Sequence, residues 1–275
     1  MRAWPLIRCL SVAGIIWAMA AGPIMAQSSD LKRLTLRQDL LGWEAVGRLE
    51  LGSGSYCSGV LIAPDLVLTA AHCLAGRSGK PVDISKLSFR SGLRDGQVVA
   101  QRDVLRAVMH QNYRPGAGTS RWNLRHDAGL VQLAQAIPAA TAAPFSVDRP
   151  RSASVSVVSY AQGRSEALSR QAVCKVLGHQ SGLLAFDCDV TFGASGAPVF
   201  DTSNGRARIV SLVSRGVRTE EQSLAFGMEL PGVVDDLKLA LRTGAGVFPK
   251  TEITARRLSI GNPAAADLGA KFVRP

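Results

Sequence analysis

Short apolar runs, separated by glycine, proline, serine and aspartate, dominate the chain from Trp43 onward. Each run has the length of a single strand and is rich in valine, leucine and isoleucine. The runs cover residues 60–62, 66–68, 98–99, 104–108, 130–133, 155–158, 198–200 and 209–213. Many short strands at this spacing predict an all-β sandwich or barrel.

The remaining segments divide this β-rich region. Residues 137–144 are low in complexity and carry two prolines, which predicts a connection between a first β unit over 41–140 and a second over 141–243. Residues 232–242 are the one predicted helix. Polar residues 27–40 indicate an N-terminal extension or short propeptide, and the glycine-, proline- and charge-rich residues 244–275 predict a flexible tail.

The first 26 residues have the pattern of a secretory signal peptide. Arg2 and Arg8 precede an apolar run over 9–21, and small residues follow up to Ala26. The run is short for a membrane span. Cleavage after Ala26 would release a periplasmic or extracellular protein, whereas an uncleaved segment would tether the same domain to the membrane.

Composition and charge narrow the class of protein. A chain of 275 residues with 47% apolar content can bury a core in one or two domains. Its net charge of +11 becomes +9 without the signal, which holds two arginines and no acid. The basic residues are scattered and only 5% of residues are aromatic, so we expect a solvated basic surface and no nucleic-acid partner.

Four cysteines remain after signal removal: Cys57, Cys73, Cys174 and Cys188. In an oxidising compartment they allow three disulfide pairings. Disulfides between cysteines that are neighbours in sequence would each close a short loop and add about 3 kcal/mol to the free energy of unfolding. A zinc site is disfavoured because no C-x-x-C pair exists, and no metal site or cofactor is predicted.

Residues 191–198 read TFGASGAP, with one serine, Ser195, among residues that have almost no side chain. A flexible linker is one explanation, and a nucleophile that a substrate approaches closely is another. The histidines His72, His110, His126 and His179 all precede Ser195. This order excludes the α/β-hydrolase arrangement, in which the histidine follows the serine, and allows the order His, Asp, Ser.

Several stretches in this order resemble the chymotrypsin-like (trypsin-like) serine proteases, particularly bacterial secreted members. Residues 57–73, CSGVLIAPDLVLTAAHC, resemble the segment with the family's histidine and local disulfide. Residues 108–113 and 126–131 resemble the H-P-x-Y and D-I-A-L motifs, and 193–198 resemble G-D-S-G-G-P. The resemblance covers roughly residues 43–230 and implies two six-stranded antiparallel β-barrels with a short C-terminal helix.

The resemblance assigns catalytic roles that the chemistry requires. A serine hydroxyl needs a base to take its proton and a third group to orient that base. We expect Ser195 as nucleophile, His72 as general base and Asp127 as its partner. The backbone N–H groups of Gly193 and Ser195 would form the oxyanion hole, which explains the small neighbours. His126 and His110 are assigned no catalytic role.

The sequence departs from the family pattern in two places. Ala194 replaces the aspartate that pairs with a newly cut N-terminus in trypsin-type members, and no I-V-G-G-like start precedes Trp43. We therefore expect a site that forms without that activation switch.

The substrate pocket is predicted from the same resemblance. Asp189 lies where trypsin-like members bind Arg or Lys side chains. Thr191, Ser214 and Gly216 are further substrate-binding candidates, and Phe226 is a residue that would obstruct the pocket. Arg215 stands where the family usually has an aromatic residue, which would favour acidic groups in the substrate.

The sequence thus predicts a secreted, monomeric serine endopeptidase that acts on proteins or peptides, possesses no cofactor and has no stable membrane association after signal removal. Two alternatives stay open. One is a catalytically silent basic binding protein on the same fold, and the other is a serine esterase.

Overall fold

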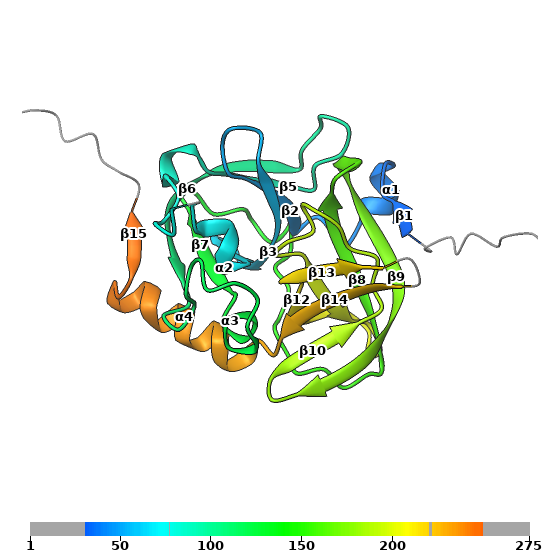
Figure 1. The fold of residues 1–275 in the computed structure, drawn as a ribbon. Helices are drawn as coiled ribbons and strands as arrows, with labels where there is room; N and C mark the ends of the chain where they lie inside the picture. The colour runs from blue at the N-terminus through cyan, green and yellow to red at the C-terminus, as the bar shows by residue number, and fades with distance from the viewer. Residues whose placement is uncertain (1–30, 77, 220–221, 250–275) are drawn as a thin grey trace, which may run out of the picture.

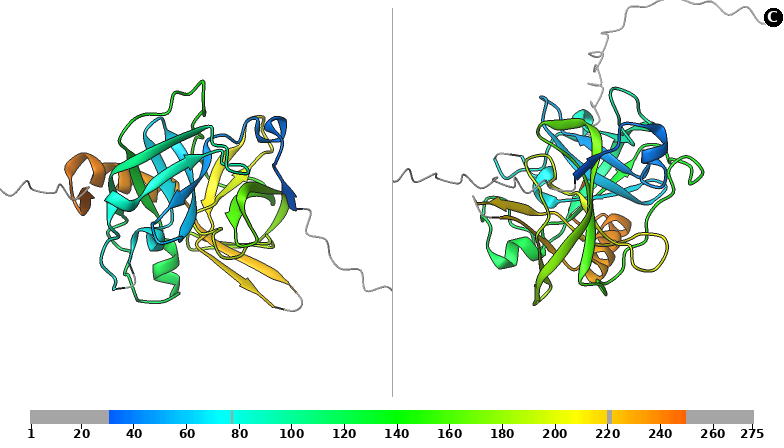
Figure 2. Two further views of the ribbon diagram at one scale, coloured as in Figure 1. Left: turned by 90° about the horizontal axis from the view of Figure 1, so that it is seen from above. Right: turned by 90° about the vertical axis from the view of Figure 1, so that its right-hand side faces the viewer.

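The computed structural model describes residues 31–76, 78–219 and 222–249. The predicted signal peptide and most of the predicted tail lie outside the described residues. Within them the structure consists of two antiparallel sheets side by side and a helix at the C-terminal end (Figures 1 and 2). The predicted two-barrel, all-β architecture is confirmed.

The first sheet closes into a barrel of six strands. The strand order runs β6-β5-β2-β3-β4-β7, and β6 also pairs with β7, which closes the ring. The strands are β2 (Val46–Glu50), β3 (Tyr56–Ala63), β4 (Leu66–Thr69), β5 (Ser88–Ser91), β6 (Ala100–Met109) and β7 (Gly129–Leu133). Closure buries the apolar faces of the runs in β3, β4 and β7, such as Val60, Leu68 and Leu130.

The second sheet has the order β12-β11-β8-β9-β10-β14-β13. Its strands are β8 (Ser154–Ala161), β9 (Arg164–Gln180), β10 (Leu183–Phe186), β11 (Pro198–Asp201), β12 (Arg208–Leu212), β13 (Arg215–Arg218) and β14 (Ser223–Met228). The Ser211 hydroxyl donates to the Met228 carbonyl at 2.9 Å, and this bond links β12 to β14 across the sheet.

Both ends of the described chain are paired with a barrel. Strand β1 (Leu31–Arg33) lies on β9, and helix α1 (Arg37–Leu40) follows it, so this part of the predicted extension belongs to the second sheet. Strand β15 (Val247–Pro249) pairs with β6. This differs from a flexible tail starting at residue 244, because the outer edge of β6 offers free backbone groups to an extended segment.

The predicted helix is confirmed as α4 (Pro231–Thr243). Proline at its first turn needs no N–H partner there, and Gly244 ends the helix with a φ of 79°. Val234, Leu237 and Leu241 bury one face of the helix against the first barrel. No helix in the described ranges is both long and apolar enough to cross a membrane.

An aromatic cluster joins the two barrels. Trp43 lies before β2, Phe145 follows the connection between barrels, and Phe200 lies on β11. Their ring centroids are 4.6–6.0 Å apart. A second tie is the Tyr160 hydroxyl on β8, which donates to the Leu93 carbonyl of the first barrel at 3.0 Å. These contacts hold in register the two halves from which the site is built.

Candidate active site

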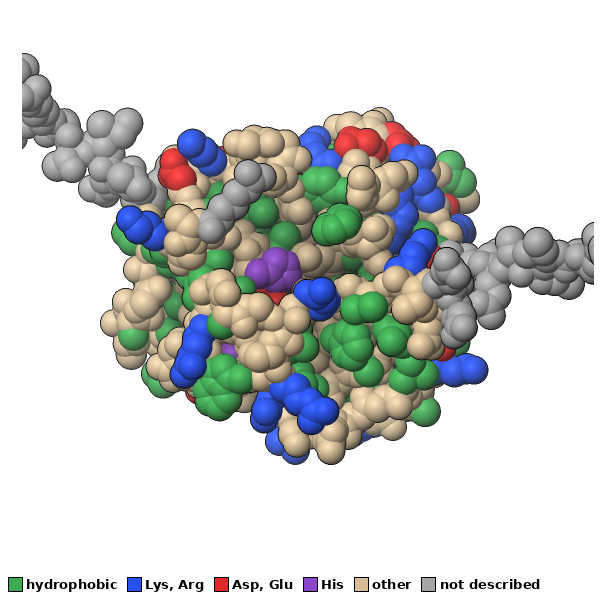
Figure 3. Space-filling model, viewed as in Figure 1, with side chains coloured by type: hydrophobic (Ala, Val, Ile, Leu, Met, Phe, Trp, Pro, Cys, Tyr) green, Lys and Arg blue, Asp and Glu red, His purple; other side chains and the backbone are tan. Residues whose placement is uncertain are grey.

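His72 lies on α2 (Ala71–Leu74), a single helical turn that follows directly from β4. The Cys57–Cys73 disulfide ties this turn back to β3. Ala71, Cys73 and Leu74 are buried, while the His72 side chain is 34% exposed. The turn therefore points one polar side chain outward from an apolar support. In Figure 3 a histidine is exposed in the middle of a hollow on this face.

Asp127 follows α3 (Arg121–Arg125) and precedes β7, and its side chain is only 6% exposed. Its carboxylate accepts from the His72 backbone N–H at 2.8 Å and lies 2.7 Å from Nδ1 of the same residue. The Ser214 hydroxyl donates to its Oδ2 atom. Three partners thus satisfy this buried charge and orient the imidazole, whose Nε2 is left for another group.

Tyr113 is a neighbour of Asp127 that the sequence analysis gave no role. Burial raises the pKa of its hydroxyl to about 12, and the negative charge of Asp127 adds to this effect. The phenol is therefore uncharged at neutral pH. With His72, Asp127, Ser214 and Arg215 it lines a cleft of about 380 Å³.

The Ser195 turn needs its small residues for steric reasons. Gly193 has a φ of +90°, and a Cβ there would lie 2.4 Å from the ring of Tyr56. Gly196 has a φ of +75°, and a Cβ there would lie 2.4 Å from the Thr69 hydroxyl. Ala194 and Ala197 are fully buried. The turn packs so closely against the first barrel that larger side chains have no room, which excludes a flexible linker.

The peptide between Phe192 and Gly193 has a defined direction. The Phe192 carbonyl accepts from the Gln162 N–H at 2.6 Å. Since the C=O and N–H of a trans peptide point in opposite directions, the Gly193 N–H points away from Gln162. Within the described ranges, neither this N–H nor that of Ser195 donates to a protein acceptor. Two free donors on one turn are what an oxyanion hole requires.

Hydrogen bonds from Ser58 on β3 tie the Ser195 turn to the first barrel, which carries His72. The Ser58 N–H donates to the Ser195 carbonyl at 2.8 Å, and the Ser58 hydroxyl donates to the Gly193 carbonyl at 3.0 Å. The Gly196 N–H donates to the Val213 carbonyl at 2.8 Å. The Ser195 hydroxyl itself bonds to no group in the described residues.

The structure places the predicted pocket residues in several different contacts. Ser214 bonds to Asp127, and Gly216 lies on β13 opposite Ala225 of β14. The Phe226 carbonyl accepts from the Ser214 N–H at 2.9 Å. Asp189 forms an ion pair with Arg218 at the end of β13. Sequence reasoning missed Arg218, because nothing local to this residue shows that a carboxylate lies beside it.

The other histidines make contacts of their own. His110 is buried with Nε2 3.3 Å from Asp236, and its ring stacks on His126 with centroids 4.9 Å apart. His179 on β9 pairs with Glu229.

Cys57, His72 and Cys73 form the one close group of potential metal ligands found in the described residues. Both sulfurs are bonded to each other, so they offer no thiolate to a metal. The second disulfide, Cys174–Cys188, links β9 to the segment before Asp189.

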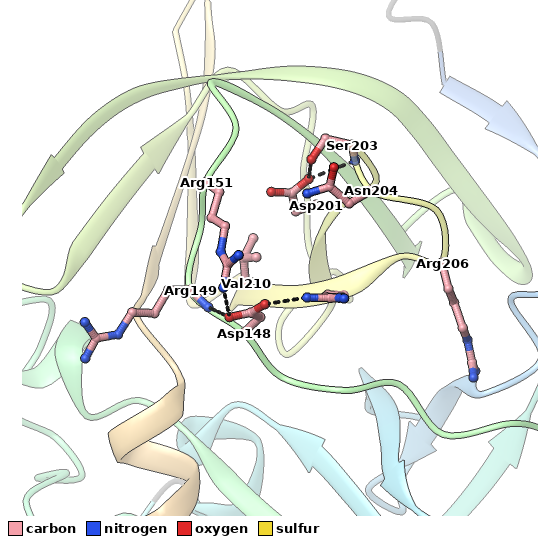
Figure 4. Close-up of a pocket in the computed structure, with 9 residues that line it drawn as sticks. Asp148, Arg149, Arg151, Asp201, Ser203, Asn204, Arg206 and Val210 are labelled. Atoms are coloured by element: carbon pink, nitrogen blue, oxygen red, sulfur yellow. Dashed lines mark hydrogen bonds and ion pairs between the residues drawn. The ribbon is translucent and has the colours of Figure 1, made fainter.

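An arginine-rich hollow on the second barrel is not a convergent site. Asp148 pairs with Arg151 and Arg208 there, whereas Arg149 and Arg206 point away from the centre (Figure 4). The cavity measures about 10 Å³, which is the size of a single water.

Two β-barrels with a His–Asp pair on one and a tight serine turn on the other define the chymotrypsin-like fold of serine proteases. Residues 57–208 match the family described as trypsin-like peptidase domain. The chain belongs to this family.

Similar proteins agree with this assignment. Mouse (Mus musculus) cathepsin G is 37% identical over 79 residues, which are 29% of this chain and 26% of that protein. Serine protease 56 of the same organism is 34% identical over 91 residues, 33% of this chain and 14% of that protein. The matches thus span about a quarter or less of these relatives.

Solved structures share the fold over most of the chain. A Glu endopeptidase solved in complex with MPD has a TM-score of 0.63 at 17% identity, covering 76% of this chain and 95% of its own. The protease Anisep from Arthrobacter nicotinovorans has a TM-score of 0.58 at 18% identity, covering 70% and 93%.

Proposed function

We propose that this protein is a serine endopeptidase that hydrolyses peptide bonds through an acyl-enzyme on Ser195. The observation that carries the proposal is the double hydrogen bond from His72 to Asp127, through the backbone N–H and through Nδ1. It fixes the imidazole with Nδ1 engaged, so Nε2 is the nitrogen free to accept a proton.

Each step of the reaction has a group in this chain. The Ser195 oxygen attacks the substrate carbonyl while its proton passes to Nε2 of His72. The Gly193 and Ser195 N–H groups stabilise the resulting oxyanion. His72 then gives the proton to the leaving amine, and water, activated by the same imidazole, releases the acyl group. Asp127 stays ionised and stabilises the imidazolium.

The test is active-site labelling with a fluorophosphonate, followed by mass spectrometry of the labelled peptide. We expect label on Ser195 in the parent protein and none in Ser195→Ala or His72→Ala. Ser203→Ala and His179→Ala are matched controls far from the site and should keep the label. Absence of label on a folded, disulfide-intact parent protein would refute the proposal and favour a silent binding protein.

Esterase activity is the other alternative, and the same preparation decides it. The endopeptidase proposal expects internal cleavage of an unstructured protein such as reduced, alkylated casein. Hydrolysis of simple esters without any peptide cleavage would favour the esterase.

We also propose that residues 1–26 direct export and are removed. Two disulfides support this, since such bonds persist in oxidising compartments. Expression of the full chain in a bacterium, with mass spectrometry of the mature N-terminus, should give Gln27 in the periplasmic or secreted fraction. Recovery of an uncleaved chain in the membrane fraction would show that the segment is an anchor.

A preference for Arg or Lys in the substrate was predicted from Asp189 alone. The ion pair with Arg218 compensates that charge within the protein. A cationic substrate would have to displace Arg218 before it could bind to Asp189, which argues for a different preference.

A further inference from the structure

The segment just before Gly193 packs against strand β13, where Val190 contacts Gly216. The peptide carbonyl that Ser195 attacks must place its oxygen at the Gly193 N–H, so the side chain of the same substrate residue lies beside the segment just before Gly193. Bonds from Gly196 to Val213 and from Ser214 to Asp127 hold the start of β13 next to this position.

The Val190 side chain fills the space between the backbone of this segment and β13. A Cβ at Gly216 would lie only 2.7 Å from Cγ2 of Val190 and 3.2 Å from its carbonyl oxygen. Val190 is 5% exposed, whereas Gly216 is exposed. Gly216 and Val190 are therefore already in van der Waals contact, and no substrate side chain can pass between them without moving the Val190 methyl groups.

The charged side chains around Asp189 also disfavour a cationic side chain in the substrate. Asp189 pairs with Arg218, and its backbone N–H donates to the Gln171 side chain at 2.7 Å. Arg164 is a second guanidinium near Asp189, and burial lowers the pKa of Arg164. Two arginines against one carboxylate leave this region with a net positive charge.

The open cleft of about 380 Å³ lies on the other side, toward His72 and Tyr113. Neither Val190 nor Gly216 is among its lining residues. This cleft has room for other residues of a bound peptide.

We propose that Val190 is a specificity-determining residue, and that the protein cleaves after small uncharged residues such as alanine, glycine or serine. The inference rests on the proposed endopeptidase function and names its substrate class. It assigns Arg218 a separate task, which is to neutralise Asp189.

The test uses fluorogenic peptides that differ only in the residue before the cleaved bond: Ala, Leu, Lys or Glu. For the parent protein we expect a kcat/KM for Ala at least 10-fold above each of the others. Val190→Ala should raise kcat/KM for Leu about 10- to 200-fold relative to Ala, the range that one or more methylenes are worth in an apolar pocket. Val173→Ala, which removes the same atoms from exposed Val173 on β9, should leave the preference unchanged.

The variant Arg218→Gln separates the steric effect of Val190 from the charge effect of Arg218. Because Val190 still blocks access, this variant should cleave the Lys peptide as slowly as the parent protein does. The double variant Val190→Gly with Arg218→Gln should gain Lys cleavage, since it both opens the pocket and frees Asp189. Rapid Lys cleavage by Arg218→Gln alone would overturn the role of Val190.

Fluorophosphonate labelling of every variant distinguishes failure of the endopeptidase proposal from failure of the specificity inference. Without label on the parent protein the endopeptidase proposal fails, and the inference fails with it. With label present, equal cleavage of the Ala, Leu and Lys peptides by the parent protein refutes the inference alone. Should Val190→Ala not fold, the isosteric Val190→Thr must keep the preference of the parent protein.

Discussion

The Ser214 hydroxyl donates a hydrogen bond to Oδ2 of Asp127, the carboxylate oxygen that also contacts Nδ1 of His72. The bond spans the junction, because Asp127 belongs to the first barrel and Ser214 to the second. The second barrel therefore helps to hold the acid that orients the histidine of the first.

Removal of this bond should slow the reaction while the fold is kept. A hydrogen bond to a charged group is worth about 1.5–3 kcal/mol, so Ser214→Ala should lower kcat about 10- to 100-fold. Ser211→Ala, which removes a hydroxyl bonded to Met228 instead of Asp127, is the matched control. Equal losses in both variants would mean that the Asp127 bond has no catalytic effect.

Asp127→Asn should lower kcat by about 10⁴ with little change in stability. The amide keeps the shape of the carboxylate but favours the wrong tautomer of His72. Steady-state kinetics on a peptide substrate measure the loss, and Asp235→Asn on the exposed side of α4 serves as the control. A loss below about 10-fold would remove Asp127 from the proposed catalytic group.

Gly193→Ala should disable the oxyanion hole. Its Cβ would meet the Tyr56 ring at 2.4 Å, so the turn must move, and loss of one donor costs about 10²–10³ in kcat. Gly42→Ala has the same kind of strain, with a φ of +85°, but its Cβ meets nothing within 4 Å. If both variants lose activity equally, backbone strain rather than the lost donor is the cause.

The two disulfides should differ in their effect on activity. Each closes a loop, of sequence separation 16 for Cys57–Cys73 and 14 for Cys174–Cys188. Double alanine variants should each lose about 3 kcal/mol of unfolding free energy in urea titrations. Only the first should also lower kcat of the folded protein strongly, because Cys73 is adjacent to His72. A larger loss of kcat in the Cys174–Cys188 variant would contradict this.

His110 should make stability depend on pH. Burial lowers the pKa of His110 below its ordinary value of 6.5, while its bond to Asp236 opposes this shift. The unfolded chain therefore takes up a proton at a higher pH than the folded one, and the stability contributed by neutral His110 is lost as the pH falls below about 6.5. Urea unfolding at pH 7.5 and 5.0 should show a smaller pH effect in His110→Gln than in the parent protein. The exposed His179→Gln is the control, and an unchanged pH effect in His110→Gln would contradict the prediction.

Sequence patterns predicted strands best where one face is fully buried. The runs at 60–62, 66–68, 104–108 and 130–133 all lie inside strands of the first barrel. Residues 98–99 precede β6 instead. The long strand β9 was missed because its second half is largely exposed and carries polar residues, so it has no apolar run.

The sequence by itself determined the family, the two-barrel fold and helix α4, because each depends on local motifs or on the length and spacing of apolar runs. Only the tertiary structure decided which groups meet across the junction. The bond from Ser214 to Asp127, the ion pair of Arg218 with Asp189 and the contact of Val190 with Gly216 join residues that are distant in sequence or lie on separate strands. Such contacts depend on strand register and barrel closure, which no local sequence pattern encodes.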